Sequence, residues 1–384
     1  MGGGTPSTSK SEYWNGDIDW YAPAEIADQI YVSSSQKKIT QAGYDNSSAK
    51  MLPVGTVLFT SRAGIGKTAI LAQKGCTNQG FQSIVPHEGQ LDSYFIFSRT
   101  DELKKYGETT GAGSTFVEVS GKQMARMELL MPPTLSEQQE IGRFFASLDS
   151  TITLHQRKLE SMKLLKKSLL QKMFPKSGET VPEVRFPGFT DAWEQRKLGD
   201  IVERITRKNT NNESDLPLTI SAQYGLIDQN EFFDKRIASK DVSGYYLVKN
   251  GEFAYNKSTS NDAPWGAVKR LDRYKNGVVS TLYIVFSIRD SNTTDSDFLA
   301  TYYDTDRWHS GIQAVAAEGA RNHGLLNISA SDFFNTTLKM PADIEEQRKI
   351  GAFFKEIDNT ITLHQRKVEI LHKLKKSLLQ QMFV

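Results

Sequence analysis

The sequence predicts a mixed α/β protein in which two variable α/β domains are separated by two long, similar helices. Three observations lead to this prediction. A length of 384 residues suits two or three domains. Residues 131–174 recur at 340–383, with about 27 of 44 positions identical. The segments before the two copies share almost no identity, yet both hold short β-branched and aromatic runs bounded by Gly, Pro, Asn and Asp.

The two variable domains are expected at residues 1–130 and 201–339. In the first, the apolar runs predict strands at 57–60 and 81–85 and a helix opening at 94–97. In the second, they predict a strand at 282–286 and a helix opening at 298–303. Strands mixed with helices in this way indicate an α/β domain.

The two constant segments, residues 131–175 and 340–384, have a heptad period and are predicted to be spacer helices. Prolines at 132, 133 and 341 mark their starts. The first helix leads into the second variable domain and the second helix leaves it, and domain termini usually lie close together. The helices are therefore expected to pair as an antiparallel coiled coil, with a pseudo-two-fold internal repeat. Lys166 and Lys375 are expected on solvated faces.

The proline-bearing residues 176–200 are expected to form a linker. Its end, residues 193–201, resembles a lead-in to the second variable domain. At the repeat offset, the counterpart of this lead-in would precede Met1. We therefore expect the chain to begin inside its first domain, with the N-terminal lead-in missing.

Composition excludes several classes of protein. The single cysteine, Cys76, cannot form an internal disulfide, and no Cys/His cluster has zinc-ligand spacing. No apolar run reaches the length of a membrane span, and the start lacks the regions of a signal peptide. A cytoplasmic protein without a metal site or a membrane association is expected. The net charge of +2 does not by itself predict a polyanionic partner.

No motif in the chain predicts catalysis or a bound cofactor. Residues 61–68, SRAGIGKT, resemble a P-loop, but Ser61 stands where the first glycine of that signature is required. Gly64-x-Gly66 also fits a relaxed dinucleotide pattern, but no βαβ unit or ribose-binding acid accompanies it. A glycine-rich turn that presents Arg62 and Lys67 at the surface is the better interpretation.

Side chains suited to DNA gather in glycine-bearing loops of both variable domains. Arg and Lys can pair with guanine, and Asn and Gln can pair with adenine, in the major groove. Ordinary loop composition could explain each cluster alone, but two different clusters on one spacer suit a split, asymmetric DNA site. The candidate DNA-binding residues are Tyr13, Trp14, Arg62, Lys67, Gln79, Gln82, Tyr224, Lys257, Arg321 and Asn322.

These residues resemble those of a known family, the specificity subunits of Type I restriction–modification enzymes. The resemblance covers the whole chain and is carried by residues 3–7 (GGTPS), 13–20 (YWNGDIDW), 58–67 and 78–81, and by the Glu-Gln-x-x-Ile-Gly starts at Glu137 and Glu346. It implies a non-catalytic, DNA-binding subunit whose two target-recognition domains read a bipartite double-stranded DNA target. It also implies docking of two modification (methyltransferase) subunits, which use S-adenosylmethionine, and two restriction subunits, which use ATP and Mg.

Two other interpretations of the chain are weighed against this one. The first is a coiled-coil adaptor, unrelated to restriction, whose two domains bind proteins. The second is a P-loop nucleotidase. Steep salt dependence of binding would favour DNA, because phosphate contacts release counterions.

Overall fold

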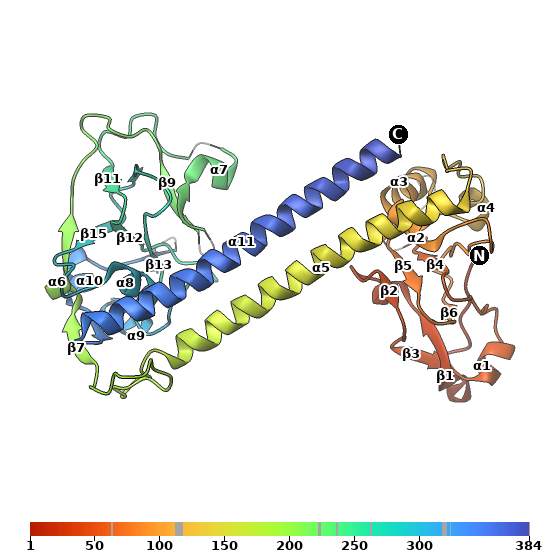
Figure 1. The fold of residues 1–384 in the computed structure, drawn as a ribbon, viewed down its shortest axis with the longest axis horizontal. Coiled ribbons are helices and arrows are strands. Elements are labelled where there is room, and N and C mark those ends of the chain that lie inside the picture. The colour runs from red at the N-terminus through yellow and green to blue at the C-terminus, as the bar shows by residue number, and fades with distance from the viewer. Residues whose placement is uncertain are drawn as a thin grey trace. The chain divides into compact units, whose positions relative to one another are not determined.

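The computed structural model describes residues 1–62, 64–111, 118–221, 224–235, 237–261, 263–316, 321–322 and 324–383, with the side chains of Arg321 and Asn322 left undescribed. The chain forms two compact units (Figure 1). The first unit joins residues 1–157 to 366–384, and the second contains residues 158–365. Both long helices therefore contribute to both units. No helix in these ranges is long and apolar enough to cross a bilayer.

The first unit holds two small sheets and a set of short helices. One sheet has the order β3-β1-β6, with β1 antiparallel to β3 and parallel to β6, and the other has the order β2-β5-β4. The strands are β1 (Trp14–Tyr21), β2 (Tyr31–Val32), β3 (Lys37–Ile39), β4 (Val57–Phe59), β5 (Thr68–Leu71) and β6 (Cys76–Thr77). The helices are η1 (Ser11–Tyr13), η2 (Pro23–Glu25), α1 (Gln41–Asp45), α2 (Ser93–Ser98), α3 (Thr100–Gly111) and α4 (Gly121–Met124).

The second unit is built on a four-stranded antiparallel sheet of order β13-β12-β15-β8, with four two-stranded ladders around it. The strands are β7 (Glu194–Lys197), β8 (Val202–Ile205), β9 (Leu218–Ser221), β10 (Gly225–Asp228), β11 (Tyr246–Lys249), β12 (Phe253–Asn256), β13 (Ala267–Arg270), β14 (Asn276–Val279), β15 (Ile284–Ile288), β16 (Arg321–Asn322), β17 (Leu325–Leu326) and β18 (Thr337–Met340). The helices are α6 (Leu198–Ile201), α7 (Gln229–Phe233), α8 (Ser296–Tyr303), α9 (His309–Val315) and α10 (Ala330–Asn335). Its core is aromatic, with Phe253 stacked on Phe286 at 5.2 Å and Tyr255 on Phe333 at 4.7 Å between ring centroids.

Most of the elements predicted from the sequence are confirmed by β4, α2, α8 and β15. The strand predicted at residues 81–85 is wrong. Phe81 and Ile84 each make a single bridge, to Thr60 and to Val57, and Gln82 bridges instead to Gly2. Phe81 and Ile84 meet Thr60 and Val57 in one antiparallel register, so the segment lies beside β4, but it pairs there through separate bridges and not as a continuous strand.

The two long helices, α5 (Leu135–Lys172) and α11 (Ile344–Met382), confirm the helical prediction for the constant segments. Each begins at an equivalent polar residue. The hydroxyl of Thr134 accepts from the backbone N–H of Glu137, and a carboxylate oxygen of Asp343 accepts from that of Glu345. Both residues therefore satisfy backbone donors that have no partner inside the helix.

The helices pair antiparallel within each unit, as the connectivity predicts. In the first unit, Phe145 contacts Phe383, Asp149 pairs with Lys375, and Gln156 hydrogen bonds to His372. In the second, Lys166 pairs with Asp358 and Phe174 contacts Phe354. In both units the partner number falls as the number on α5 rises, which defines the antiparallel direction.

The expectation that Lys166 and Lys375 are simply solvated is wrong, because each forms an ion pair between the helices. Lys375 lies 2.6 Å from Asp149, and Lys166 lies 2.7 Å from Asp358. The two pairs are equivalent at the repeat offset, so each helix supplies the lysine of one pair and the aspartate of the other. This reciprocity is the pattern of a two-fold symmetric interface. Burial by itself would lower the pKa of Lys166, but the charges of Asp304 and Asp358 outweigh burial and raise it.

We expect Lys375→Met to lower the free energy of unfolding of the first unit by about 1 to 3 kcal/mol, because it leaves the largely buried Asp149 carboxylate without its cation. The side chain of Asp149 is 9% exposed, and the Tyr94 hydroxyl donates to it at 2.9 Å. Urea denaturation measures the effect, with Lys376→Met, at an exposed neighbouring position, as the control. Equal losses in the two variants would show that the ion pair does not stabilise the unit.

A repeated joint connects each variable domain to its long helix. Gln138 of α5 accepts from the backbone N–H of Asp92 at 3.2 Å, and Gln347 of α11 accepts from that of Asp295 at 2.9 Å. Asp92 and Asp295 are the N-caps of α2 and α8. Both glutamines are buried and also donate to proline carbonyls, those of Pro132 and Pro341. The repeat thus holds α2 against α5 and α8 against α11 in the same way.

Candidate nucleic-acid interface

The glycine-rich turn of the first unit joins β4 to β5 and is closed by one hydroxyl. Thr60 donates from Oγ1 to the Gly64 carbonyl at 2.7 Å and accepts from the Lys67 N–H at 2.9 Å. Gly64 and Gly66 have φ values of 104° and 94°, in the region that favours glycine. Because the turn leads into an antiparallel strand, it lacks the helix N-terminus that a P-loop places against phosphate.

The middle of the turn is buried, and the residues on either side of it are exposed. Ile65 is buried against Leu103 of α3, and the backbone at Gly66 lies so close to Lys104 that a Cβ would collide with that side chain. Arg62 and Lys67 are exposed. The structure therefore holds the backbone of the turn in place while it presents two cations to solvent, as the sequence predicts.

The structure brings the second sequence cluster of this domain beside the turn. The Ser61 N–H donates to the Gly80 carbonyl at 2.8 Å, and a Cβ on Gly80 would lie 3.5 Å from Nε of Arg62. Gln79 is exposed, and its Oε1 accepts from the Thr5 hydroxyl at 2.6 Å. Gln82 is half-buried beside Gly2. Arg62 and Gln79 thus belong to adjacent segments, whereas Gln82 is placed beside Gly2.

Tyr13 and Trp14 have a different place from these exposed residues. Tyr13 is 8% exposed, and its hydroxyl accepts from Lys10 at 3.0 Å. Trp14 donates from Nε1 to the Ser7 carbonyl and packs edge-on against Trp20, with ring centroids 5.1 Å apart. Through these contacts both side chains pack around the start of β1. Trp14 is half-buried, so part of its side chain remains accessible for a contact with DNA.

The second unit repeats the same frame with different residues. Gly55 and Gly251 both have φ of 84°, and their N–H groups donate to Leu71 at 2.9 Å and to Leu271 at 2.8 Å. Ser61 follows β4 and Lys257 follows β12. The Ser61 carbonyl accepts from the Val119 N–H, and the Lys257 carbonyl accepts from the Leu326 N–H, each at 3.0 Å. Lys257 is therefore the positional equivalent of Ser61.

The candidate residues of the second unit are only partly free. Lys257 is half-buried and donates from Nζ to the Ile328 carbonyl at 3.2 Å. Tyr224 is 51% exposed, and its hydroxyl accepts from Gln365 of α11 at 2.8 Å. Arg321 and Asn322 form β16, which pairs with β17 beside Ser258, but their side chains lie outside the described residues.

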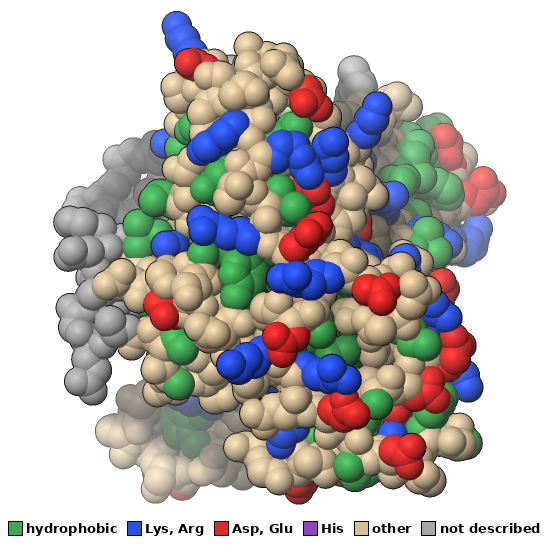
Figure 2. Space-filling view, turned by 90° about the vertical axis from the view of Figure 1, so that its left-hand side faces the viewer, with side chains coloured by type: hydrophobic (Ala, Val, Ile, Leu, Met, Phe, Trp, Pro, Cys, Tyr) green, Lys and Arg blue, Asp and Glu red, His purple; other side chains and the backbone are tan. Residues whose placement is uncertain are grey.

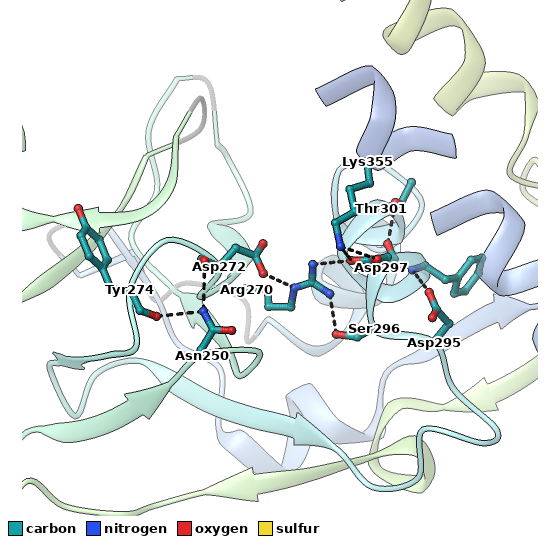
Figure 3. A network of polar contacts seen from close by, with 10 residues as sticks. Asn250, Arg270, Asp272, Tyr274, Asp295, Ser296, Asp297, Thr301 and Lys355 are labelled. Carbon is teal, nitrogen blue, oxygen red and sulfur yellow. Dashed lines mark hydrogen bonds and ion pairs between the residues drawn. The ribbon is translucent and has the colours of Figure 1, made fainter. Parts of the chain in front are cut away.

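A charged network fastens the central sheet of the second unit to its long helix (Figure 3). Arg270 on β13 donates to Asp272 at 2.6 Å, to Ser296 at 2.7 Å and to Asp297 at 2.5 Å. Lys355 on α11 lies 2.9 Å from Asp297. Burial opposes ionisation of Asp297, but hydrogen bonds from Lys355 and Arg270 outweigh it and hold its pKa below the usual value. The first unit has Ala146 at the repeat offset from Lys355 and an apolar cluster at this joint.

The face of the molecule that carries β7, α6 and β15 of the second unit mixes the two signs of charge. In Figure 2, Lys and Arg side chains alternate with Asp and Glu over the described part of this face. Phosphate binding calls for clustered positive charge. This face therefore lacks the character of a phosphate-binding surface in its described part.

Sequence reasoning did not find the structural role of several residues that join the variable domains to the long helices or the helices to each other. These are the buried glutamines at 138 and 347, the glycines at 142 and 351, and the cross-paired Asp149 and Lys375. One signal was available, because all of them are identical in the two copies of the repeat. In the described ranges, no group of three or more His, Cys, Asp or Glu side chains is arranged to hold a metal ion.

Comparisons with known proteins agree with this geometry. A Type I restriction enzyme specificity subunit of Methanocaldococcus jannaschii, MjaIX, is 33% identical over 211 residues, which are 53% of this chain and 49% of that protein. The specificity subunit of an Escherichia coli Type I restriction enzyme is 29% identical over 157 residues, 39% of this chain and 38% of that protein. The matches thus span about half or less of the curated relatives.

The fold is shared with a crystal structure of a Type I restriction–modification S subunit from M. genitalium. The TM-score is 0.62 at 11% identity, over 99% of this chain and 92% of that one. The family model described as "Type I restriction modification DNA specificity domain" matches residues 1–164 and 190–373. The chain therefore belongs to the family of Type I restriction modification DNA specificity domains.

Proposed function

We propose that this chain is the non-catalytic, DNA-reading subunit of a Type I restriction–modification complex. The observation that carries the proposal is the repeated frame. Two hairpins have the same backbone hydrogen bonds, and their domains are joined to the repeated helices α5 and α11, but the two hairpins bear different side chains. A frame that is repeated within the chain but carries different side chains suits recognition of two different half-sites in one asymmetric, bipartite DNA target. Such a subunit would act in the cytoplasm, together with the DNA.

The same repeat supports an assignment of the partners. Leu154 and Leu363 are 66% and 65% exposed at equivalent positions, and Leu165 and Leu374 are 48% and 46% exposed at another equivalent pair. Each unit therefore presents one exposed leucine from α5 and one from α11. Equivalent apolar positions in both units suit two copies of one partner. We assign them to two methyltransferase subunits, which would supply S-adenosylmethionine, while two restriction subunits would supply ATP and Mg.

Base contacts in the first unit are assigned to Arg62, Lys67, Gln79 and Gln82. We expect alanine at all four to relax one half-site, at a cost of about 1 to 3 kcal/mol for each lost bidentate base contact. A residue that contacts phosphate should instead weaken all sequences alike and reduce the salt dependence. Sequencing of methylated motifs in a host that carries the chain and its methyltransferase measures the half-sites, and binding to DNA at several salt concentrations measures affinity.

In the second unit the corresponding set is Tyr224, Lys257, Arg321 and Asn322, and its alanine variant should affect only the other half-site. Lys105→Ala and Lys235→Ala, at exposed positions outside the two sets, serve as controls. Intact half-sites and affinity in either quadruple variant would show that its residues do not read DNA. Binding that ignores salt would favour an adaptor whose two domains bind proteins.

A further inference from the structure

In the second unit, the position equivalent to Arg62 is held by Ser258. After the first strand of each hairpin, one backbone carbonyl accepts the equivalent hydrogen bond at 3.0 Å. The next residue in each unit then makes a single antiparallel bridge, Arg62 to Glu118 and Ser258 to Leu325. Both Arg62 and Ser258 are exposed. The second unit therefore has a short hydroxyl side chain where the first unit has a long cation.

The segment that lies beside each of these positions also has an equivalent in the other unit. Thr60 and Asn256 directly precede the two carbonyls that define the match. Phe81 bridges to Thr60 in the first unit. In the second, the antiparallel register of β12 and β15 continues to Asn256 and Tyr283, and the Asn256 side chain donates to the Tyr283 hydroxyl at 3.0 Å. Phe81 and Tyr283 therefore take the same place in the two units.

The two residues before this aromatic position differ between the units. They are Gln79 and Gly80 in the first unit and Thr281 and Leu282 in the second. A Cβ on Gly80 would lie 3.5 Å from Nε of Arg62, so the arginine lies beside a residue that has no side chain. In the second unit, Leu282 is 54% exposed at the position of Gly80, and Thr281 is exposed. The large side chain at this edge of the hairpin thus comes from the other segment.

This exchange changes the chemistry that the edge offers to DNA. Arginine and glutamine can form hydrogen bonds with guanine and adenine, whereas leucine has no donor or acceptor in its side chain. Thymine presents a C5-methyl group in the major groove, and apolar side chains contact it there. A single exposed leucine is ordinary on a protein surface, but Leu282 stands at the place of an assigned reading edge. Contact with a methyl group would remove its apolar area from water.

We propose that Leu282, with Ser258 and Thr281 beside it, determines specificity in the second half-site by contacting the methyl group of a thymine. The two hydroxyl side chains can bond to base edges next to that thymine. These residues act together with those already assigned to the second half-site. The inference rests on the proposed DNA-reading function and names the base chemistry of one position. It requires a thymine in that half-site, on either strand.

The test uses the full chain with its methyltransferase and duplexes that carry the target found by methylated-motif sequencing. In a set of duplexes, each thymidine of the target is replaced in turn by deoxyuridine, which lacks only the methyl group. We expect one replacement in the second half-site to weaken binding about fourfold, the effect of one buried methyl group. Leu282→Ala should weaken binding to the thymidine duplex by a similar factor and should remove the difference between thymidine and deoxyuridine at that position.

Leu164→Ala removes an exposed leucine from α5 and is the matched control, which should keep the difference between the two duplexes. Unchanged thermal unfolding of the Leu282→Ala protein excludes misfolding as the cause of weaker binding. Equal binding of all the duplexes by the unaltered chain, or a methyl effect that persists in every position of the Leu282→Ala protein, would overturn this inference and leave sequence-specific binding intact. A complex that binds DNA without sequence preference would overturn the proposed function and this inference with it.

Discussion

Gly351→Ala is expected to lower the free energy of unfolding of the second unit by about 2 kcal/mol, although alanine is the better helix former by about 1 kcal/mol. A Cβ on Gly351 would lie 2.6 Å from the Phe298 nitrogen and 2.8 Å from Oδ1 of Asp295. Real Cβ atoms do not approach so closely, so α11 must move away from α8. That shift would disturb the Asp295 cap, whose carboxylate accepts from the Phe298 N–H at 2.8 Å, and a lost cap costs about 1 kcal/mol.

Gly311→Ala is the matched control for this change. Gly311 lies within α9, and a Cβ there would meet only Thr336, at ordinary distances of 3.5 and 3.7 Å. Its replacement should therefore stabilise the unit by up to about 1 kcal/mol. Urea denaturation, with hydrogen exchange in α8, separates the two. If the Gly351→Ala protein is as stable as the Gly311→Ala protein, close approach at the joint is not the reason for glycine.

The same argument applies to Gly142 in the first unit. A Cβ there would lie 2.5 Å from Oδ1 of Asp92 and 3.2 Å from the Phe95 nitrogen. We expect Gly142→Ala to increase hydrogen exchange in α2 and to leave α8 unchanged. The joint is therefore tested twice in one chain, with each unit as the reference for the other.

A four-residue insertion in both long helices is expected to lengthen the DNA spacer by one or two base pairs while both half-site sequences stay the same. Four residues add about 6 Å to a helix, and one base pair occupies about 3.4 Å. The sequence alone suggests inserting between Leu159 and Leu164. The structure refines this choice to the boundaries of the compact units, after Arg157 in α5 and after Gln365 in α11. There, the pairs Asp149–Lys375 and Lys166–Asp358 stay intact within their units.

An insertion in α5 alone is the control, because it breaks the match between the two helices and should reduce activity more than the paired insertion. Four residues also rotate the helix by about 40° beyond a full turn, so some loss is expected even for the paired variant. Methylated-motif sequencing gives the spacer. An active paired variant that keeps its original spacer, or that changes its half-site bases, would show that the recognition domains are positioned independently of the helices.

Much of the architecture could be predicted because its signals are local or repeated. A heptad period and a second copy of 44 residues can be recognised in the sequence alone, and they predicted α5 and α11; the connectivity then predicted their antiparallel pairing. The Gly64-Ile65-Gly66 turn could also be predicted, because glycine is favoured at the positive φ values found there. Family resemblance was carried by these same local motifs.

Contacts between residues far apart in the chain were decided by the tertiary structure alone. Tyr13 is a residue type common in binding sites, but here it is buried and its hydroxyl accepts a hydrogen bond from Lys10. Lys166 breaks the heptad pattern, and only the folded chain brings Asp304 and Asp358 within 2.6 and 2.7 Å of its charge. The segment at 81–85 has strand-forming residues but pairs with residues 57–60 through separate bridges. The sequence by itself determined which elements form and which two repeat, because propensity and periodicity act over a few residues; the folded chain decided which side chains are free to bind, because burial and pairing depend on neighbours that are distant in sequence.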